Sequence, residues 1–230
     1  METSLHRQLK DAYANSEADL EVKLDRYRID VVSGDELIEI QHGSLAAIRN
    51  KIQQLVGEHR VRVVKPIIAM KRLIKRSGKG RRIIDRRMSP KRCTILEVFH
   101  ELVYFSKVFP HPNLLLEVPL VFVEEWRYPG HGKRRRHRER DHEVEDQKLI
   151  EVQGIHQFRT ADDLAKLLPR RLPKPFHTQH VAEGLKINRS FAQRIAYCLR
   201  ETGAIRQVGK SGNALLYERN RQRKKNVATD

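Results

Sequence analysis

A hairpin near the N-terminus is the feature that most constrains the fold of this chain. Residues 27–32 (YRIDVV) and 36–41 (ELIEIQ) have the apolar and β-branched content of strands, and residues 33–35 (SGD) between them have the composition of a turn. The period of two along a strand places Glu39 and Gln41 on the same face of the second strand. The pattern therefore predicts two paired strands with acidic and amide side chains on one face.

Segments of helical period flank the hairpin. Residues 3–14 and 45–57 place apolar side chains at helical spacing, and each segment has a Ser or Thr near its start. Residues 61–68 form a β-branched run that predicts a buried strand. The predicted order is helix, strand, strand, helix, strand, which assigns this part of the chain to the α/β class with a mixed sheet and flanking helices.

Two carboxylates give this hairpin a candidate chemistry. Asp30 interrupts an apolar stretch between Ile29 and Val31, and a carboxylate there is costly unless it is solvated, paired or bound to a metal. Two carboxylates that meet across a hairpin can hold Mg²⁺, which activates water and stabilises charge on a phosphate. Asp30 and Glu39 are the candidate ligands. A polar-faced hairpin with ordinary acidic residues would give the same local pattern, so a purely structural role stays open.

The hairpin resembles the PD-(D/E)XK nuclease superfamily over roughly residues 1–68. In that pattern an Asp on one strand precedes (D/E)-X-K on the next, and the flanking elements have the order predicted here. This chain has Asp30 followed by Glu39-Ile40-Gln41, with Gln41 at the lysine position, a form that some restriction enzymes of the superfamily use. The resemblance implies that Asp30 and Glu39 ligate Mg²⁺ with help from the Ile40 carbonyl, and that Gln41 orients the attacking water.

The resemblance also implies roles outside the hairpin. Gln41 carries no charge, and Lys51 on the next predicted helix would supply the missing positive charge, as happens in some members. Many members have a Glu on the first helix. Glu2 is the nearest match and the third predicted metal ligand, and Glu17 and Glu21 are weaker candidates.

Residues 69–154 are predicted to extend this domain with strands and one helix. The sequence favours the following elements: basic strands at 71–76 and 81–87, a helix that starts at Ser89-Pro90 with proline in its first position, a strand at 114–126, an arginine-rich loop at 129–141, and a returning strand at 142–153.

Residues 158–218 resemble a winged helix-turn-helix domain. Thr160, Thr178 and Asn188 are the expected caps of three helices, and Gly203 is expected to end the last of them. Two short strands follow, joined by the turn at 209–213, and they predict the wing. Arg and Gln read guanine and adenine edges in a major groove, and Lys contacts phosphates. The predicted DNA contacts of this domain are Arg189, Ser190, Gln193, Arg194 and Tyr197 on the third helix and Lys210 at the tip of the wing.

Three short segments carry nearly all of the excess charge. The chain has 46 Lys and Arg against 29 Asp and Glu, a net charge of +17, and residues 79–92, 133–140 and 219–225 hold +16 of it. Clusters of this kind indicate contact surfaces for a polyanion, and DNA is the expected partner. The further predicted contacts are Arg81, Arg82, Arg134, Arg135 and Arg136.

The predicted domain organisation has three parts. Residues 1–154 form the nuclease-like domain (core 1–68, basic extension 69–154), residues 155–218 the winged helix, and residues 219–230 a basic tail. No apolar run reaches the roughly 18 residues of a spanning helix. The first ten residues lack the apolar stretch of a signal peptide, so we expect a cytoplasmic protein without membrane contact.

These features predict a Mg²⁺-dependent endonuclease that hydrolyses phosphodiester bonds of DNA, with duplex the expected form. The architecture also looks like that of an uncharacterised bacterial family that joins such a hairpin to a winged helix. Because of Gln41, a non-catalytic DNA-binding or regulatory protein with an inactive nuclease-like fold is the alternative. An adaptor whose winged helix contacts another protein, a homodimer, and RNA as the target all stay open.

Overall fold

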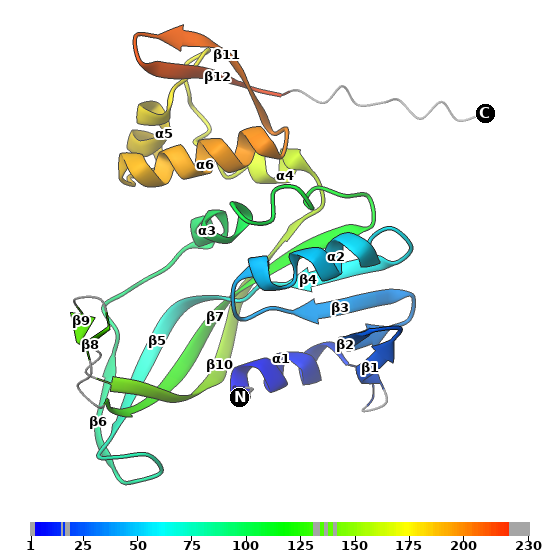
Figure 1. Ribbon diagram of the computed structural model, residues 1–230. Coiled ribbons are helices and arrows are strands. Elements are labelled where there is room, and N and C mark those ends of the chain that lie inside the picture. The colour runs from blue at the N-terminus through cyan, green and yellow to red at the C-terminus, as the bar shows by residue number, and fades with distance from the viewer. Residues whose placement is uncertain are drawn as a thin grey trace.

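A computed structural model of the chain describes residues 3–14, 16, 19–130, 134–135, 138–139 and 142–220 (Figure 1). Its centre is an eight-stranded mixed sheet with the order β1-β2-β3-β4-β7-β5-β6, in which β10 pairs with the other edge of β7. The strands of this sheet are β1 (Leu20–Leu24), β2 (Tyr27–Ser33), β3 (Glu36–Ile40), β4 (Arg60–Val64), β5 (Ile67–Arg76), β6 (Ile83–Met88), β7 (Leu114–Pro129) and β10 (His142–Phe158). The predicted α/β class is confirmed.

The predicted order of the first elements is found with one addition. The helices are α1 (Ser4–Tyr13), which Thr3 caps by accepting from the His6 amide, and α2 (Arg49–Leu55), which follows the 3-10 turn η2 (Leu45–Ala47). Strand β1 was not predicted. Its burial does not alternate, and Glu21 lies within it at φ +53°, in the left-handed region that is unusual for a non-glycine residue. Neither feature gives the two-residue period on which strand prediction depends.

Two long strands join the parts of the sheet. β7 runs parallel to β4 over its first residues and parallel to β5 over the remainder, while β10 pairs antiparallel along its other edge. The prediction of one strand over residues 61–68 is wrong, because the ladder is interrupted at Lys65-Pro66 and Pro66 has no N–H to donate. β4 pairs with β3 on one side of the break, and β5 pairs with β6 on the other, so the break separates two regions of the sheet.

The predicted start of the next helix, at Ser89-Pro90, is also wrong. Ser89 N donates to the Lys71 carbonyl at 2.9 Å, and Cys93 N donates to the Ala69 carbonyl at 3.1 Å, so this segment stays extended beside β5. Thr94 is the actual cap. It precedes the 3-10 turn η3 (Ile95–Glu97) and the short helix α3 (Val98–Leu102).

Helices cover both faces of the sheet. Leu5 and Leu9 of α1 pack on one face with Val31 and Ile38, while α2 and α3 cover the other face. The larger of these two cores continues without interruption from α3 into the C-terminal helices (Figure 1). Burial of these apolar side chains is the main stabilising term for the arrangement.

The C-terminal part has three helices and a two-stranded sheet, as predicted. They are α4 (Ala161–Ala165), α5 (Thr178–Leu185), α6 (Arg189–Glu201), β11 (Ile205–Ser211) and β12 (Ala214–Arg219). His177 rather than Thr178 occupies the cap position of α5. Strand β10 runs to Phe158, so residues 155–158, which the sequence assigned to the second domain, pair with β7. Among the described helices, none has the length and apolar character needed to cross a bilayer.

Candidate functional site

Asp30 lies where strands β2 and β3 separate. Val31 and Ile38 form the last pair of their ladder before this point. Beyond it, the Asp30 carboxylate serves as the hydrogen-bond acceptor for β3, because Ile40 N donates to Asp30 Oδ2 at 2.8 Å. The Nε2 atom of His6 on α1 lies 3.5 Å from the same oxygen. Burial raises the pKa of Asp30, but His6, the Ile40 N–H and the charge of Lys10 outweigh it and hold this pKa below its usual value.

Glu39 lies on the neighbouring strand and is only 4% exposed. Burial and the negative charge of Asp30 raise its pKa to about 7, although Lys51 and the Asp30 backbone N–H act in the opposite direction. A carboxyl group that is half protonated near neutral pH, beside an ionised Asp30, marks a place where negative charge is in excess.

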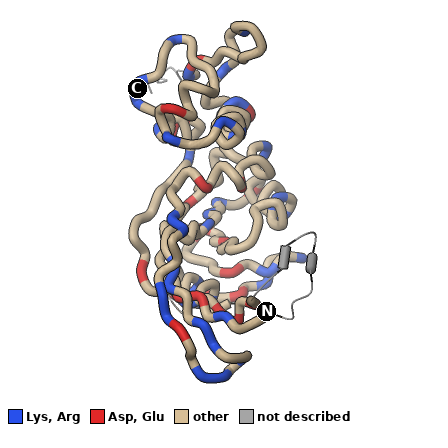
Figure 2. Tube along the Cα trace, turned by 90° about the vertical axis from the view of Figure 1, so that its left-hand side faces the viewer, with Lys and Arg blue, Asp and Glu red and all other residues tan. Residues whose placement is uncertain are grey.

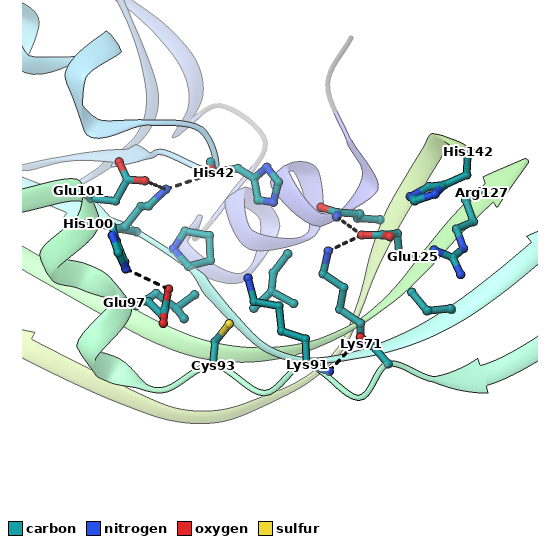
Figure 3. Close-up of a pocket in the computed structure, with 17 residues that line it drawn as sticks. His42, Lys71, Lys91, Cys93, Glu97, His100, Glu101, Glu125, Arg127 and His142 are labelled. Atoms are coloured by element: carbon teal, nitrogen blue, oxygen red, sulfur yellow. Dashed lines mark hydrogen bonds and ion pairs between the residues drawn. The ribbon is translucent and has the colours of Figure 1, made fainter. Parts of the chain in front are cut away.

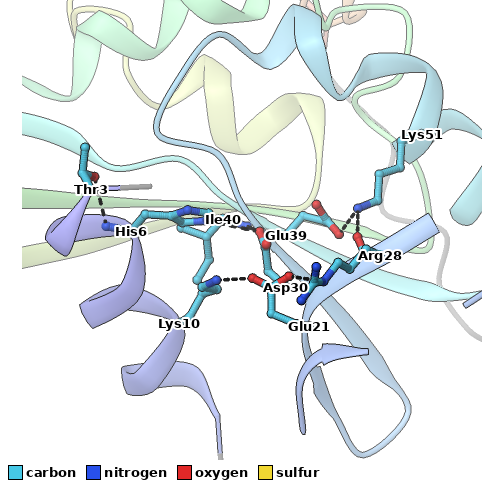
Figure 4. A network of polar contacts seen from close by, with 9 residues as sticks. All are labelled: Thr3, His6, Lys10, Glu21, Arg28, Asp30, Glu39, Ile40 and Lys51. Atoms are coloured by element: carbon cyan, nitrogen blue, oxygen red, sulfur yellow. Dashed lines mark hydrogen bonds and ion pairs between the residues drawn. The ribbon is translucent and has the colours of Figure 1, made fainter. Parts of the chain in front are cut away.

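Lys51 completes the cluster from the opposite side of the hairpin. Its ammonium group, carried on α2, donates to Glu39 Oε1 and to the Arg28 carbonyl (Figure 4). Helix α2 packs Ile52 and Leu55 into the core, and this packing directs the preceding residue toward β2 and β3. The structure therefore brings together three of the predicted site residues: Asp30, Glu39 and Lys51.

Helix α1 supplies residues that the sequence interpretation missed. His6 contacts Asp30, and Lys10, one turn later and buried, forms an ion pair with Glu21 of β1. Glu21 also pairs with Arg28 at 2.6 Å, so this weaker candidate for a metal ligand already forms ion pairs with two basic side chains (Figure 4). The sequence contained a signal for these two residues. His6 and Lys10 are four residues apart, so they lie on one face of the helix, and they directly follow the buried positions Leu5 and Leu9.

Gln41 is placed just past the end of β3. Its Nε2 donates to the Ser44 carbonyl at 2.8 Å, and its backbone N–H donates to the Val64 carbonyl at 2.9 Å. The amide group thus closes the turn into η2. Within the described part of the chain, its side chain forms no hydrogen bond with Asp30 or Glu39.

The donor set fits a magnesium ion held by two carboxylates. Mg²⁺ keeps several waters and needs only one or two carboxylates from the protein, and Asp30 with Glu39 supplies two beside the Ile40 backbone. Glu2, the third predicted ligand, and Glu17 lie outside the described residues. Within the described ranges, no group of three or more His, Cys, Asp and Glu side chains gathers to hold a metal.

Helix α6 has one exposed stripe and one covered face. The exposed stripe carries Arg189, Ser190, Gln193 and Tyr197, of which Tyr197 is 40% exposed, and Arg200 and Glu201 are exposed at the end of the helix. Arg194 differs from the expectation. It is half-buried and its guanidinium contacts Nδ1 of His100 on α3, while the ring of Phe191 stacks on His100 at 4.4 Å between centroids. The face of α6 that carries Arg194 therefore packs on the sheet-bearing part of the molecule.

The remaining predicted contacts lie at separate places. Lys210 is exposed at the turn between β11 and β12, and Arg81 and Arg82 are exposed in the turn of the long β5–β6 hairpin. Lys and Arg residues gather along this hairpin (Figure 2). Arg134 and Arg135 form β8, which pairs with β9 (Arg138–Glu139). Arg136 and most of the basic tail (residues 221–225) lie outside the described residues.

Comparison with known proteins gives one family and one relative without an assigned activity. A family described as "Domain of unknown function (DUF8091)" matches residues 3–159, more than half of the chain. An "Uncharacterized protein" of Treponema pallidum (strain Nichols) is 29% identical over 222 residues, which cover 95% of this chain and 85% of the relative. No solved structure matches the chain. The family match ends one residue after β10, which is the last strand of the large sheet along the chain.

Proposed function

The chain belongs to the family described as "Domain of unknown function (DUF8091)", and we propose that this member is a Mg²⁺-dependent endonuclease that hydrolyses phosphodiester bonds of DNA. The proposed site consists of Asp30, Glu39 and Lys51 at the point where β2 and β3 diverge. The proposal starts from the resemblance of the sequence to the PD-(D/E)XK superfamily and to a winged helix. The basic clusters support a polyanionic substrate.

The position of Lys51 is the observation that carries the proposal. The sequence has Gln41 where the superfamily pattern has a lysine, and the missing positive charge arrives from α2 instead, in contact with Glu39. A cation next to two carboxylates can stabilise the charge that develops on a phosphate as its ester bond breaks. Lys51 is the cation that contacts Glu39 directly, whereas Arg28 and Lys10 are paired with Glu21.

Asp30 and Glu39 would hold the magnesium ion, with the Ile40 carbonyl beside them. When bound, Mg²⁺ supplies an activated water and neutralises charge on the phosphate oxygens. The chain's own residues prepare the site. His6 and the Ile40 N–H keep Asp30 ionised, and Lys51 favours the ionised form of Glu39, whose pKa would otherwise rise further. Glu39 must lose its proton to bind a cation.

The C-terminal part would hold the substrate. The exposed stripe of α6, with Arg189, Gln193 and Tyr197, presents the side chains that read base edges or stack. Lys210 on the wing and the β5–β6 hairpin with Arg81 would contact phosphates. We leave Arg194 out of this surface because His100 already engages it.

Plasmid relaxation tests the proposal. Supercoiled DNA is incubated with Mg²⁺ and the full chain, and conversion to nicked or linear forms is followed over time. The wild type should convert it, whereas Asp30→Asn combined with Glu39→Gln should reduce the rate by at least about 10³-fold. Asp35→Asn is the matched control, because Asp35 is an exposed acid of the same hairpin and forms its ion pair with Arg60. Equal activity in wild type and double variant would refute the assigned site.

A DNA-binding protein without nuclease activity is the second candidate, and two observations favour it. The Gln41 side chain closes the turn at Ser44 and has no described contact with the carboxylates. Glu39 is nearly inaccessible, which a purely structural ion pair with Lys51 would also explain. Retained DNA binding without Mg²⁺-dependent cleavage identifies this second candidate.

A further inference from the structure

A cavity of about 770 Å³ opens on the sheet where β4 ends and β5 begins. Residues of β5, β7, β10, the extended segment 89–93 and α3 line it, together with His42 from the turn after β3 (Figure 3). Asp30, Glu39 and Lys51 are not among its lining residues. This volume lies in the range of cavities that hold small molecules and cofactors, and the proposed cleavage does not account for it.

One side of the cavity is a buried polar network. Glu125 on β7 is 5% exposed, and it accepts hydrogen bonds from the Lys71 ammonium and from Nε2 of Gln147 at 2.9 Å. Gln147 on β10 is buried as well. Burial raises the pKa of Glu125, but Lys71, Gln147 and Arg127 outweigh it and keep the carboxylate ionised. These groups are held in fixed positions, which a specific ligand site requires.

The cavity retains positive charge after its internal ion pairs are formed. Two of its three carboxylates already face a lysine, Lys71 for Glu125 and Lys65 for Glu101 at 3.7 Å, and the third, Glu97, lies 3.6 Å from Nε2 of His100. In contrast, Lys91 and Arg127 form no ion pair with any carboxylate in the described part of the chain. Two cations without a fixed counterion favour an anionic ligand, and an Arg among them suits a phosphate.

The other lining residues suit a flat, partly apolar group. Ile67, Ile68 and Leu73 contribute apolar surface beside the polar network. Gln147 donates from Nε2 to Glu125, and its buried Oε1 has no hydrogen-bond partner in the described part of the chain, while the ring of His42 can donate and accept. The cavity thus offers positive charge, apolar surface and hydrogen-bonding groups. A planar heterocycle that has hydrogen-bonding edges and carries a phosphate matches all three.

We propose that this cavity binds a nucleoside phosphate, with Lys91 and Arg127, which lie on either side of Lys71 (Figure 3), as the cations that attract the phosphate and the base packed near Gln147 and His42. Binding needs neither Asp30 nor Glu39, so the proposal goes beyond cleavage. It rests on the proposed function in one respect: Lys91 belongs to the basic segment 79–92, so a nucleic-acid strand held by that segment would bring one nucleotide to the cavity.

Calorimetric titration of the full chain with single ligands tests the proposal. The probes are the four deoxynucleoside 5′-monophosphates, deoxyribose 5-phosphate and inorganic phosphate. At least one mononucleotide should bind at least about tenfold more tightly than the two probes that lack a base. Lys91→Ala combined with Arg127→Ala should weaken that binding at least about tenfold. Lys107→Ala combined with Arg171→Ala, two exposed cations outside the cavity, is the control of equal charge change.

Three results would overturn the proposal: no mononucleotide binding by the wild type, equal affinity for inorganic phosphate and nucleotides, or equal losses in the cavity and control variants. Asp30→Asn with Glu39→Gln should bind nucleotides like the wild type, so failed cleavage and a failed cavity are told apart. A duplex carrying 2-aminopurine identifies the source of the ligand. A fluorescence increase that mononucleotide suppresses indicates an unstacked nucleotide of a strand, and no increase with retained mononucleotide binding indicates a free nucleotide.

Discussion

Two buried glutamate–lysine pairs lie on the same sheet, and their carboxyl groups have opposite pKa shifts. Glu39 with Lys51 and Glu125 with Lys71 are both hydrogen-bonded ion pairs, and the two carboxylates are 4% and 5% exposed. The pKa of Glu39 is raised to about 7, whereas that of Glu125 is lowered. Burial is the largest influence in both cases and raises both pKa values, and only at Glu125 do the neighbouring groups outweigh it.

The neighbours of each pair explain the difference. Glu125 receives a second hydrogen bond from Gln147 and faces the charge of Arg127. Glu39 has the negative charge of Asp30 beside it. The pair at Glu125 is therefore electrostatically complete, while the pair at Glu39 lacks about one positive charge. A divalent cation would supply that charge, which is why we assign catalysis to Glu39 and ligand binding to the cavity of Glu125.

The largest expected effect is on the cleavage rate when Lys51 is replaced. Lys51→Met should lower the rate of Mg²⁺-dependent cleavage by about 10²- to 10³-fold, because it removes the cation beside the scissile phosphate. Stability should change little, since Glu39 without Lys51 keeps its proton more readily. Single-turnover cleavage and urea unfolding of the same preparation measure the two effects.

Lys107→Met serves as the control, because this exposed lysine lies outside both sites. If Lys51→Met cleaved at the wild-type rate, the pair at Glu39 would be structural, like the pair at Glu125. That outcome would remove the distinction between the two pairs.

Replacement of Lys71 should affect stability instead. Lys71→Met leaves the buried Glu125 carboxylate without its ion-pair partner, and the free energy of unfolding should fall by about 3 kcal/mol. Lys71 is itself 30% exposed, so water replaces part of the lost interaction and keeps the effect below that of a fully buried pair. Urea unfolding at pH 7 measures the change, and a loss as small as that of Lys51→Met would contradict the comparison.

The pH dependence of stability should have opposite signs at the two carboxyl groups. Because the folded state raises the pKa of Glu39 from 4.5 to about 7, this group stabilises the fold fully below about pH 4.5 and loses that contribution as the pH rises through 7. Glu39→Gln should therefore gain stability relative to the wild type between pH 5 and 8, by about 2 kcal/mol in the presence of a chelator.

Glu125 provides the matched variant. Its lowered pKa stabilises the fold above its ordinary value of 4.5, and this contribution is lost as the pH falls below it. Glu125→Gln should be less stable than the wild type at pH 7, and the difference should shrink in acid. The assignment would be contradicted if the difference in stability from the wild type had the same sign and the same pH dependence for both variants.

The Glu39 pair illustrates how far the sequence alone could go. Asp30, Glu39 and Lys51 were predicted as a group because the two-residue period of a strand and a known motif indicate which side chains meet across a hairpin. The C-terminal helices were predicted because Asn188 and Gly203 mark the ends of α6 locally. Features that depend on neighbouring residues in the chain are accessible to this kind of reasoning.

The Glu125 pair could not be predicted in this way. Lys71, Glu125 and Gln147 come from three strands far apart in the sequence, and they meet only through the registers of β5, β7 and β10. The two errors in the predicted elements have different causes. The break at Pro66 is a local effect of proline, which has no N–H, whereas tertiary hydrogen bonds to β5 hold residues 89–93 extended despite a helix-start pattern at Ser89-Pro90. Arg194, exposed in a helical projection, is covered by α3 for the same reason.

The smallest expected effect comes from the second donor of Glu125. Gln147→Leu removes the amide that donates to Glu125 Oε2 at 2.9 Å but keeps the ion pair with Lys71. The pKa of Glu125 should rise toward that of Glu39, and the free energy of unfolding should fall by about 1 kcal/mol, the contribution of one hydrogen bond. Carboxyl ¹³C NMR titration of Glu125 measures the first effect, and Gln157→Leu, whose amide donates to Glu117, is a control elsewhere on β10. An unchanged pKa for Glu125 would mean that Lys71 and Arg127 set its ionisation without Gln147, and the difference between the two pairs would then rest on Asp30.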